Sequence, residues 1–317
     1  MTVVPTFHPA GFDRALARAR MREDDVSAML LTSPENVFYA TGYTSLPSAG
    51  NPILYTLRNR LPYFAYIDDS GATTLMCWGF SAEEVDFGAD EIVGFNSFPT
   101  AIAALEELVR TRVAAGATLA VEDTCPRYVL EAIEASGVAR SRLVSADRTL
   151  AALRLVKSER EIELLRRSTE IIETTASELF PLLREGMSRQ EIMREARTRL
   201  FQNGANGISH LTFSFGDSNP EVEADEPLAA GRLITLDLGG ILDGYCSDNR
   251  RYAYLGTIPT ALQTRYDAMV AIVDGVGAAL VPGATYADVF QLALRLFAQH
   301  DIELMARFTH VGHNIGL

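Results

Sequence analysis

Residues 233–251 read LITLDLGGILDGYCSDNRR, and the interpretation of the second half of the chain starts from them. An apolar, strand-forming run leads into Asp243-Gly244, a dipeptide that favours a two-residue hairpin turn. Asp237 lies inside this run, where an uncompensated carboxylate would cost several kcal/mol. The stretch therefore predicts a β-hairpin that carries a carboxylate in need of a partner.

Asp248 is the candidate partner because of the hairpin register. A turn centred on Leu242-Asp243 places Asp237 and Asp248 directly opposite each other, and a turn centred on Asp243-Gly244 makes them diagonal neighbours. In both registers the two carboxylates share one face of the hairpin, with Cβ atoms about 5 to 8 Å apart. A three-residue turn would place them on opposite faces, so the prediction depends on the turn.

Two neighbouring carboxylates repel each other unless a shared proton, an arginine or a bound cation compensates their charge. Arg250 and Arg251 follow closely, so a purely structural aspartate–arginine network is one interpretation. A metal site is the other, with His313 as the candidate imidazole ligand. Such a set suits manganese, cobalt, iron or zinc. His210, in a strand expected at 208–215, has two equally weighted interpretations: facing the site, or lying on the surface.

The rest of the chain divides into two regions with different patterns. Between residues 11 and 150 strand-like stretches, one of them at 37–40, alternate with helix-like ones, which predicts a compact α/β domain. From Ser158 onward, a capping-box pattern opens a long helix with an apolar stripe from Ile162 to Leu183, and a second such pattern at Ser188 opens another helix. Four strands, two more helices and a strand-like stretch at 304–309 follow. The domain boundary is expected between residues 148 and 158.

Composition limits the classes of function. The 317 residues are 48% hydrophobic and 22% charged, which is typical of a globular protein of about two domains. A net charge of -13 repels phosphate backbones and anionic membrane surfaces, so neither nucleic acid nor a membrane is an expected partner. Three widely spaced cysteines without a C-x-x-C pair argue against a disulfide framework. We therefore expect a protein of the reducing cytoplasm.

Three segments together resemble one known family. Residues 236–251, followed by GHNIGL at 312–317, resemble the pita-bread metallohydrolases, which include methionine aminopeptidase, Xaa-Pro aminopeptidase, prolidase and creatinase. The segment LRLVKSEREI at 153–162 is similar to the opening of the family's catalytic domain. LLTSPENVFYATGY at 30–43 looks like the N-terminal domain of the Xaa-Pro and creatinase branch.

The resemblance implies both a fold and a site. The fold is an α/β creatinase-like N-terminal domain over residues 1–152 and an α+β pita-bread domain over residues 153–317. The family site holds two divalent ions (Mn, Co, Fe or Zn) through two aspartates, one histidine and two glutamates, and Asp237, Asp248 and His313 match the first three. Two such ions activate a water for attack on an amide. A small peptide or amide substrate and a homodimer are implied as well.

Three departures from the family pattern affect this expectation. Both family glutamates would fall after Leu317, so we expect a pita-bread domain that is incomplete at its C-terminus, in a fragment or in a degenerate member that binds no metal. The loop at 216–226, where the peptidases and creatinase have a histidine, has glutamates and no histidine. Thr309 replaces the histidine four positions before the metal ligand, which leaves the neighbouring His310 as the candidate catalytic proton donor.

Three functions stay open at this point. The leading hypothesis is a metal-dependent hydrolase of the Xaa-Pro aminopeptidase or dipeptidase type, which cleaves a small peptide or amide with a metal-activated water. A creatinase-like amidinohydrolase or amidohydrolase would act on a small non-peptide substrate without metal. The third hypothesis is an inactive binding or dimerisation module.

Overall fold

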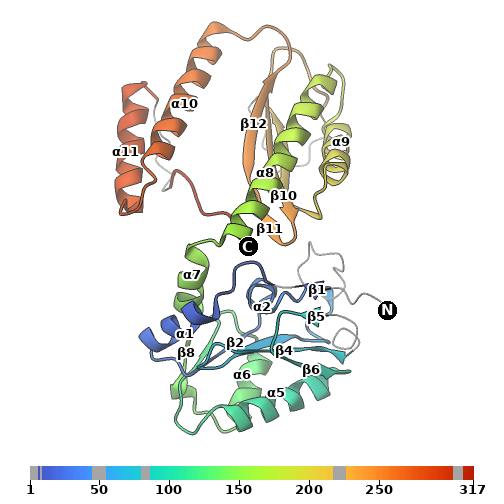
Figure 1. The fold of residues 1–317 in the computed structure, drawn as a ribbon. Helices are drawn as coiled ribbons and strands as arrows, with labels where there is room; N and C mark the ends of the chain where they lie inside the picture. Colours follow the sequence, from blue (N-terminus) through green and yellow to red (C-terminus); the bar gives the residue numbers. More distant parts are fainter. Residues whose placement is uncertain (1–5, 8, 45–54, 80–85, 217–225, 303–309) are drawn as a thin grey trace.

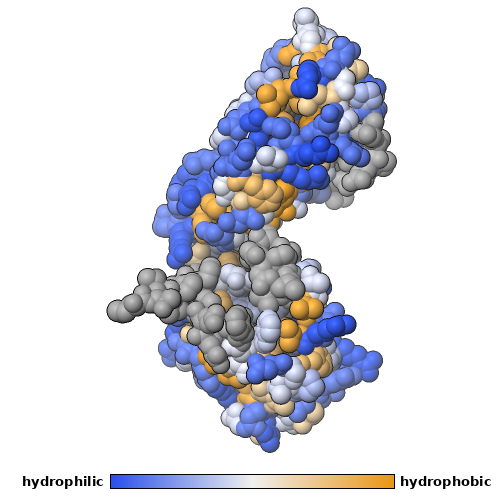
Figure 2. Space-filling view, turned by 90° about the vertical axis from the view of Figure 1, so that its right-hand side faces the viewer, coloured by the Kyte–Doolittle hydropathy of each residue, from blue (hydrophilic) through white to orange (hydrophobic). Residues whose placement is uncertain are grey.

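The computed structural model describes residues 6–7, 9–44, 55–79, 86–216, 226–302 and 310–317, which form two domains (Figure 1). The N-terminal domain is a mixed sheet between helices, and the C-terminal domain is an antiparallel sheet flanked by helices. Figure 2 shows the C-terminal domain as an elongated body that rises from the N-terminal one. The chain passes from one to the other between helices α7 (Asp147–Leu155) and α8 (Glu159–Leu179).

The N-terminal domain is built on a six-stranded sheet with the order β6-β4-β3-β2-β7-β8. The central strand pairs β2–β3 and β3–β4 are antiparallel, and the outer pairs are parallel. The strands are β2 (Ala28–Leu31), β3 (Phe64–Ile67), β4 (Thr73–Trp78), β6 (Glu91–Phe95), β7 (Leu119–Val121) and β8 (Leu143–Ser145). A separate parallel pair joins β1 (Thr6–Phe7) to β5 (Asp86–Phe87).

Helices cover both faces of this sheet (Figure 1). On one face α5 (Phe98–Arg112) and α6 (Arg127–Ala135) pack against strand residues such as Leu30 and Phe64. The other face is covered by α1 (Arg14–Glu23), α2 (Pro34–Thr41) and α7 (Asp147–Leu155). The α/β layering expected from the alternating pattern is therefore confirmed.

The prediction of a strand at residues 37–40 is wrong, because these residues lie in helix α2. The helix begins after Ser33, whose hydroxyl accepts a hydrogen bond from the backbone N–H of Asn36 at 3.3 Å, and Pro34 occupies a first-turn position. Gly42 ends it with a φ of 76°. These end signals override the strand preference of the β-branched and aromatic residues between them.

The C-terminal domain has β10 (Leu233–Leu242) at the centre of its sheet. β9 (Gly207–Phe215) pairs with one side of β10, and β11 (Tyr245–Cys246) and β12 (Asn249–Tyr254) pair with the other, all antiparallel. Alternate residues of β10 (Ile234, Leu236 and Leu238) are at most 1% exposed. They belong to a core with α8 (Glu159–Leu179) and α9 (Arg189–Gln202), and this leaves the intervening residues to the opposite face.

The junction between the domains is held by hydrogen bonds around the first turn of α8. The Ser158 hydroxyl accepts from the backbone N–H of Glu161 at 3.2 Å and donates to the backbone carbonyl of Ala10 at 2.8 Å. The Glu161 carboxylate accepts from the backbone N–H of Ser158 at 2.7 Å and from the hydroxyl of Tyr245 at 3.0 Å. The capping box predicted for this helix therefore also joins the two domains.

Helices α10 (Thr260–Ala278) and α11 (Tyr286–Gln299) form a pair beside the sheet (Figure 1). Ile272 is the one buried residue of α10, whereas Val270 and Val273 on the same helix are exposed. The strand predicted at 304–309 lies outside the described residues. Across the described part of the chain, no helix combines the length and the apolar character needed to cross a bilayer.

Candidate metal centre

The hairpin of β10 and β11 turns at Asp243-Gly244, which is the second of the two registers considered from the sequence. The φ angles of 47° at Asp243 and 90° at Gly244 are both positive, as a type I′ turn requires. Asp237 lies opposite Arg250, so Asp248 is its diagonal neighbour. The predicted hairpin and the shared face of its two carboxylates are confirmed.

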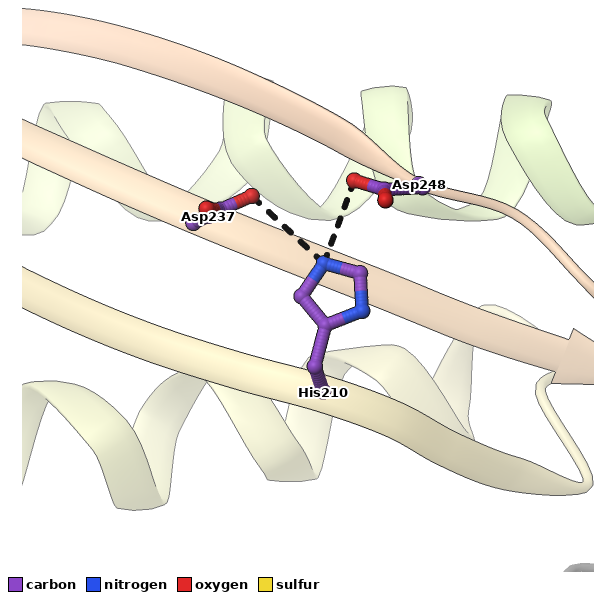
Figure 3. A group of neighbouring side chains, drawn as sticks. All are labelled: His210, Asp237 and Asp248. Atoms are coloured by element: carbon purple, nitrogen blue, oxygen red, sulfur yellow. Dashed lines mark ion pairs between the residues drawn. The ribbon is translucent and has the colours of Figure 1, made fainter. Parts of the chain in front are cut away.

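His210 of β9 joins the two aspartates in a three-residue cluster (Figure 3). Its Nε2 atom lies 3.5 Å from Oδ1 of Asp237 and 3.3 Å from Oδ1 of Asp248. One potential ligand atom from each residue lies within 4.8 Å of the others. His210 lies in β9, Asp237 lies in the adjacent β10, and Asp248 lies between β11 and β12, and the three side chains converge on one point.

The sequence left the role of His210 undecided because that role depends on the pairing of β9 with β10. His210 lies opposite Gly239, and the register shifts between Gly239 and Gly240. A Cβ atom at Gly239 would lie 2.5 Å from Cε1 of His210, so only glycine leaves room for the imidazole to lie across the strand. The sequence contains two signals for this contact, a histidine in a predicted strand and a glycine pair after Asp237. They indicate a contact only when the register of β9 against β10 is known.

Arg250 also binds Asp237, so part of the structural aspartate–arginine network exists. Nε of Arg250 donates to Oδ2 of Asp237 at 3.1 Å, and Nη2 donates to the same oxygen. The other oxygen of Asp237 faces His210. Arg251 instead forms an ion pair with Glu173 of α8. Arginine therefore compensates one side of Asp237 and leaves its second oxygen directed into the cluster.

These contacts shift the pKa values of Asp237 and His210. The hydrogen bond with His210 lowers the pKa of Asp237 below its usual range, Arg250 adds to this effect, and burial opposes it. The same hydrogen bond, together with the charges of both aspartates, raises the pKa of His210 against the effect of burial. The cluster thus favours a protonated imidazole beside ionised carboxylates. A cation bound there would replace that proton, because a metal ligand must be the neutral imidazole.

His313 approaches Asp248 from the C-terminal segment. Its Nε2 lies 3.1 Å from Oδ2 of Asp248, and its Nδ1 lies 3.0 Å from the backbone carbonyl of Asn314. The segment is tied to the hairpin by a β-bridge in which the backbone N–H of Cys246 donates to the carbonyl of Gly316 at 2.9 Å. Asp248 therefore has one histidine at each carboxylate oxygen.

The remaining residues singled out from the sequence lie elsewhere. His310 is exposed and does not line the cleft that contains His313, and its role as proton donor stays a prediction. Glu226 forms an ion pair with Arg232 at 3.6 Å. The other glutamates of the 216–226 loop and Thr309 lie outside the described residues.

A buried pair of serines fixes the chain immediately before Asp248. Ser247 is fully buried, and its backbone N–H donates to the carbonyl of Gly240 at 2.9 Å. The hydroxyl of Ser168 on α8 donates to the hydroxyl of Ser247 at 2.9 Å, and the Ser247 hydroxyl donates to the backbone carbonyl of Ser168 at 3.0 Å. Helix α8 thereby holds the hairpin in the position that brings Asp248 beside Asp237.

The cluster opens into a cleft of about 750 Å³ between the two domains. His210, Asp248 and His313 line it from the C-terminal domain. The N-terminal domain contributes Asn36 and Glu122 to the facing wall. This volume is in the range of clefts that bind small molecules or short peptides.

The donor set fits a divalent cation. Carboxylate oxygens and imidazole nitrogens from His210, Asp237 and Asp248 are close enough to share one ion, and His313 adds a nitrogen beside Asp248. Oxygen-rich sets with imidazole suit manganese, iron, cobalt and zinc. Asp237 is also held in place by a hydrogen bond from Arg250, in the way that neighbouring groups orient a metal ligand before the ion binds.

Comparisons with known proteins agree with this arrangement. Residues 163–317 match the model of metallopeptidase family M24, and residues 14–156 match that of the creatinase/prolidase N-terminal domain. An uncharacterized peptidase of Staphylococcus saprophyticus is 27% identical over 304 residues, which cover 94% of this chain and 81% of that protein.

Two solved structures have a similar fold. The prolidase from Pyrococcus horikoshii superposes with a TM-score of 0.76 at 19% identity, covering 96% of this chain and 82% of that one. The dipeptidase PepE from Mycobacterium ulcerans superposes with a TM-score of 0.74 at 20% identity, with the same two coverages of 96% and 82%.

Proposed function

The chain belongs to the pita-bread M24 metallopeptidase family, with a creatinase/prolidase-type N-terminal domain, and from this premise we propose that it is a metal-dependent hydrolase of short peptides. The observation that carries the proposal is the convergence of His210, Asp237 and Asp248 on one point, beside a cleft that His210 and Asp248 line. We further propose the Xaa-Pro dipeptides named for the prolidase relatives as its first substrates to test.

In this proposal Asp237, Asp248 and His313 hold the divalent metal, and His210 is an additional ligand. Bound there, divalent ions would lower the pKa of a water and polarise the amide carbonyl. The protein's own contribution is to orient these ligands. Ser168 and Ser247 fix the hairpin, and the β-bridge to Gly316 places His313.

Proton transfer to the leaving amine requires a further group near the cleft. We propose His310 for this role, because it is exposed to solvent and lies three residues before His313, which lines the cleft although His310 itself does not. A solvent-exposed imidazole is a common general acid in proteins. The substitution His310→Gln tests the assignment: kcat falls and metal content is retained, and an unchanged kcat would contradict it.

The decisive experiment combines metal content with activity. The protein is loaded with manganese or zinc, and hydrolysis of alanyl-proline is followed by the release of proline. We expect bound metal by elemental analysis, hydrolysis that stops after chelation, and metal affinity at least about tenfold lower in Asp248→Asn. Hydrolysis that survives chelation would contradict the proposal and favour creatinase-like chemistry.

Asp243→Asn is the matched control for this experiment. Asp243 lies in the same hairpin and would undergo the same chemical change, but it is exposed at the turn and is not part of the cluster. Asparagine also tolerates its positive φ. Asp243→Asn is expected to bind metal and to hydrolyse alanyl-proline as the unmodified protein does. Equal losses in Asp243→Asn and Asp248→Asn would point to damage of the hairpin fold.

A further inference from the structure

The two carboxylates of the metal centre are not equivalent, because an arginine is bound to one of them. Arg250 of β12 lies directly opposite Asp237 of β10 in the strand register. Its Nε donates to Oδ2 of Asp237 at 3.1 Å, and its Nη2 donates to the same oxygen. Among the described residues Asp248 has no arginine partner and faces His210 and His313 instead. Arg250 therefore distinguishes Asp237 from Asp248.

The backbone register places the guanidinium beside Asp237. Directly opposite residues of an antiparallel pair have Cβ atoms about 4.5 to 5.5 Å apart, so their side chains meet without a long reach. On the other side of β10, Asp237 lies opposite Thr212, which carries no charge. The side chain of Arg250 is 56% exposed and that of Asp237 is 19% exposed, so the guanidinium covers the carboxylate from its solvent side.

These hydrogen bonds limit what Asp237 can offer to a metal ion. A carboxylate oxygen has two lone pairs, and both lone pairs of Oδ2 are used by N–H groups of Arg250. Oδ1 faces Nε2 of His210 at 3.5 Å. A carboxylate that binds one ion through both oxygens, or that bridges two ions with one oxygen each, needs Oδ2 as well. Asp237 therefore has one oxygen free for a metal ion.

The charge of the cluster leads to the same limit. When the imidazoles are neutral, Asp237 and Asp248 carry two negative charges, and Arg250 adds one positive charge beside them. One divalent ion would change the net charge of this group from about −1 to about +1, whereas two ions would bring it to about +3. The described side chains therefore compensate one divalent ion and not two.

An arginine beside a ligating carboxylate can orient the ligand, which strengthens metal binding, or repel the ion, which weakens it. Asp237 is already oriented by its place in the central strand and by the contact of Oδ1 with His210. Even with the dielectric constant of water, a unit charge about 6 Å from a divalent ion changes the affinity for that ion by about a factor of ten. Repulsion is therefore the larger of the two effects of Arg250.

We propose that Arg250 limits the His210–Asp237–Asp248 cluster to a single divalent ion, because it occupies Oδ2 of Asp237 and supplies the positive charge that a second cation would bring. This stoichiometry departs from the two ions that the family resemblance implies. The inference rests on the proposed function for the presence of a metal. The number of bound ions is a separate property and is measurable without turnover.

The first measurement is the number of ions per chain. The full chain is dialysed to equilibrium against manganese(II), and elemental analysis gives the ratio of bound metal to protein. We expect this ratio to level off at a single ion, with the EPR spectrum of an isolated manganese(II) centre. A plateau at two ions, with the spectrum of a magnetically coupled pair, would overturn the inference.

Two variants separate the charge of Arg250 from its hydrogen bonds. Arg250→Gln keeps an N–H donor opposite Asp237 but removes the charge. In titration calorimetry this variant should bind manganese(II) about tenfold more tightly than the unmodified protein. Arg250→Lys keeps the charge, and its affinity should stay close to that of the unmodified protein. Equal or weaker binding in Arg250→Gln would show that Arg250 does not act as a competing cation and would overturn the inference.

Arg251→Gln is the matched control. Arg251 is the next residue of β12 and would lose the same charge, but it pairs with Glu173 of α8 and not with the cluster. At an ionic strength of about 0.1 M, charges more than about 10 Å apart are largely screened. Arg251→Gln should therefore bind manganese(II) as the unmodified protein does. A gain in affinity equal to that of Arg250→Gln would count against a specific role of Arg250.

The results for metal binding and for turnover are independent of each other. A single bound ion without hydrolysis of alanyl-proline would support the role of Arg250 and contradict the proposed function. Hydrolysis by a protein that binds two ions would support the proposed function and overturn the role of Arg250.

Discussion

At the scale of single residues, the position of His210 depends on the missing side chain of Gly239. A Cβ atom there would lie 2.1 Å from Oγ of Ser209 and 2.5 Å from both Cε1 of His210 and the backbone carbonyl oxygen of Ser247. Real Cβ atoms do not approach other atoms so closely, so the imidazole or the hairpin would have to move. One methyl group is therefore enough to separate the members of the cluster.

We expect Gly239→Ala to weaken binding of manganese or zinc at least about tenfold, as measured by titration calorimetry, because His210 is displaced from the aspartates. Gly277→Ala in α10 is the control. An added Cβ at Gly277 meets no atom within 4 Å, and alanine favours a helix interior. Equal affinity in Gly239→Ala and the unmodified protein would show that His210 is not a ligand.

Glu122 gives a pH-dependent prediction. Its pKa is lower in the folded protein than the ordinary value of 4.5, so its stabilising contribution is fully present above that value and is lost as the pH falls through the folded pKa. Glu122→Gln should lower the free energy of unfolding by about 1–3 kcal/mol at pH 7. The difference between the two proteins should shrink in urea unfolding below pH 4.5, and a constant difference would contradict the prediction.

At the scale of elements, end signals and long periodic patterns were predictable from the sequence. The capping boxes at Ser158 and Ser188 begin α8 and α9. The later part of the apolar stripe predicted for α8, at Ile172, Ala176 and Leu179, packs into the core, whereas Ile162 at its start is 39% exposed. The turn residues of the hairpin left two registers open, and the structure has the one centred on Asp243-Gly244. These features are encoded within a few neighbouring residues.

The features that the sequence did not predict depend mostly on residues that are far apart along the chain. Helix α2 was predicted as a strand over residues 37–40 because its apolar pattern was given more weight than its caps. The role of His210 was left undecided because it follows from a pairing with Gly239, 29 positions further along the chain. Asn36 and Arg154 meet through the packing of the first domain against the linker, for which the sequence has no local pattern.

At the scale of the whole molecule, the cleft depends on the relative position of two domains. The Ser158 hydroxyl caps α8 and also bonds to the carbonyl of Ala10 in the N-terminal domain. Cytoplasmic location and a homodimer stay predictions. The junction itself is open to a direct test, because the chain contains a second capping box of the same type.

Ser158→Ala and Ser188→Ala remove the same helix cap, each at a cost of about 1 kcal/mol. Ser158→Ala also removes the bond to Ala10, and we expect a further loss of about 1 kcal/mol in denaturant unfolding. Proteolysis between residues 155 and 159 should be faster in Ser158→Ala alone. The same cleavage rate in both variants would show that this bond does not hold the domains together.

Strand β10 supplies the apolar core with Ile234, Leu236 and Leu238 on one face, and Asp237 of the metal centre lies on the other. Point substitutions on either face leave this division intact. Insertion or deletion of a single residue between Asp237 and Asp248 would exchange the faces beyond it, directing one carboxylate toward α8 and an apolar side chain toward solvent. A change in the length of this hairpin that keeps both carboxylates on one face must therefore come in steps of two residues or be absorbed by a β-bulge, whereas its composition can vary one residue at a time.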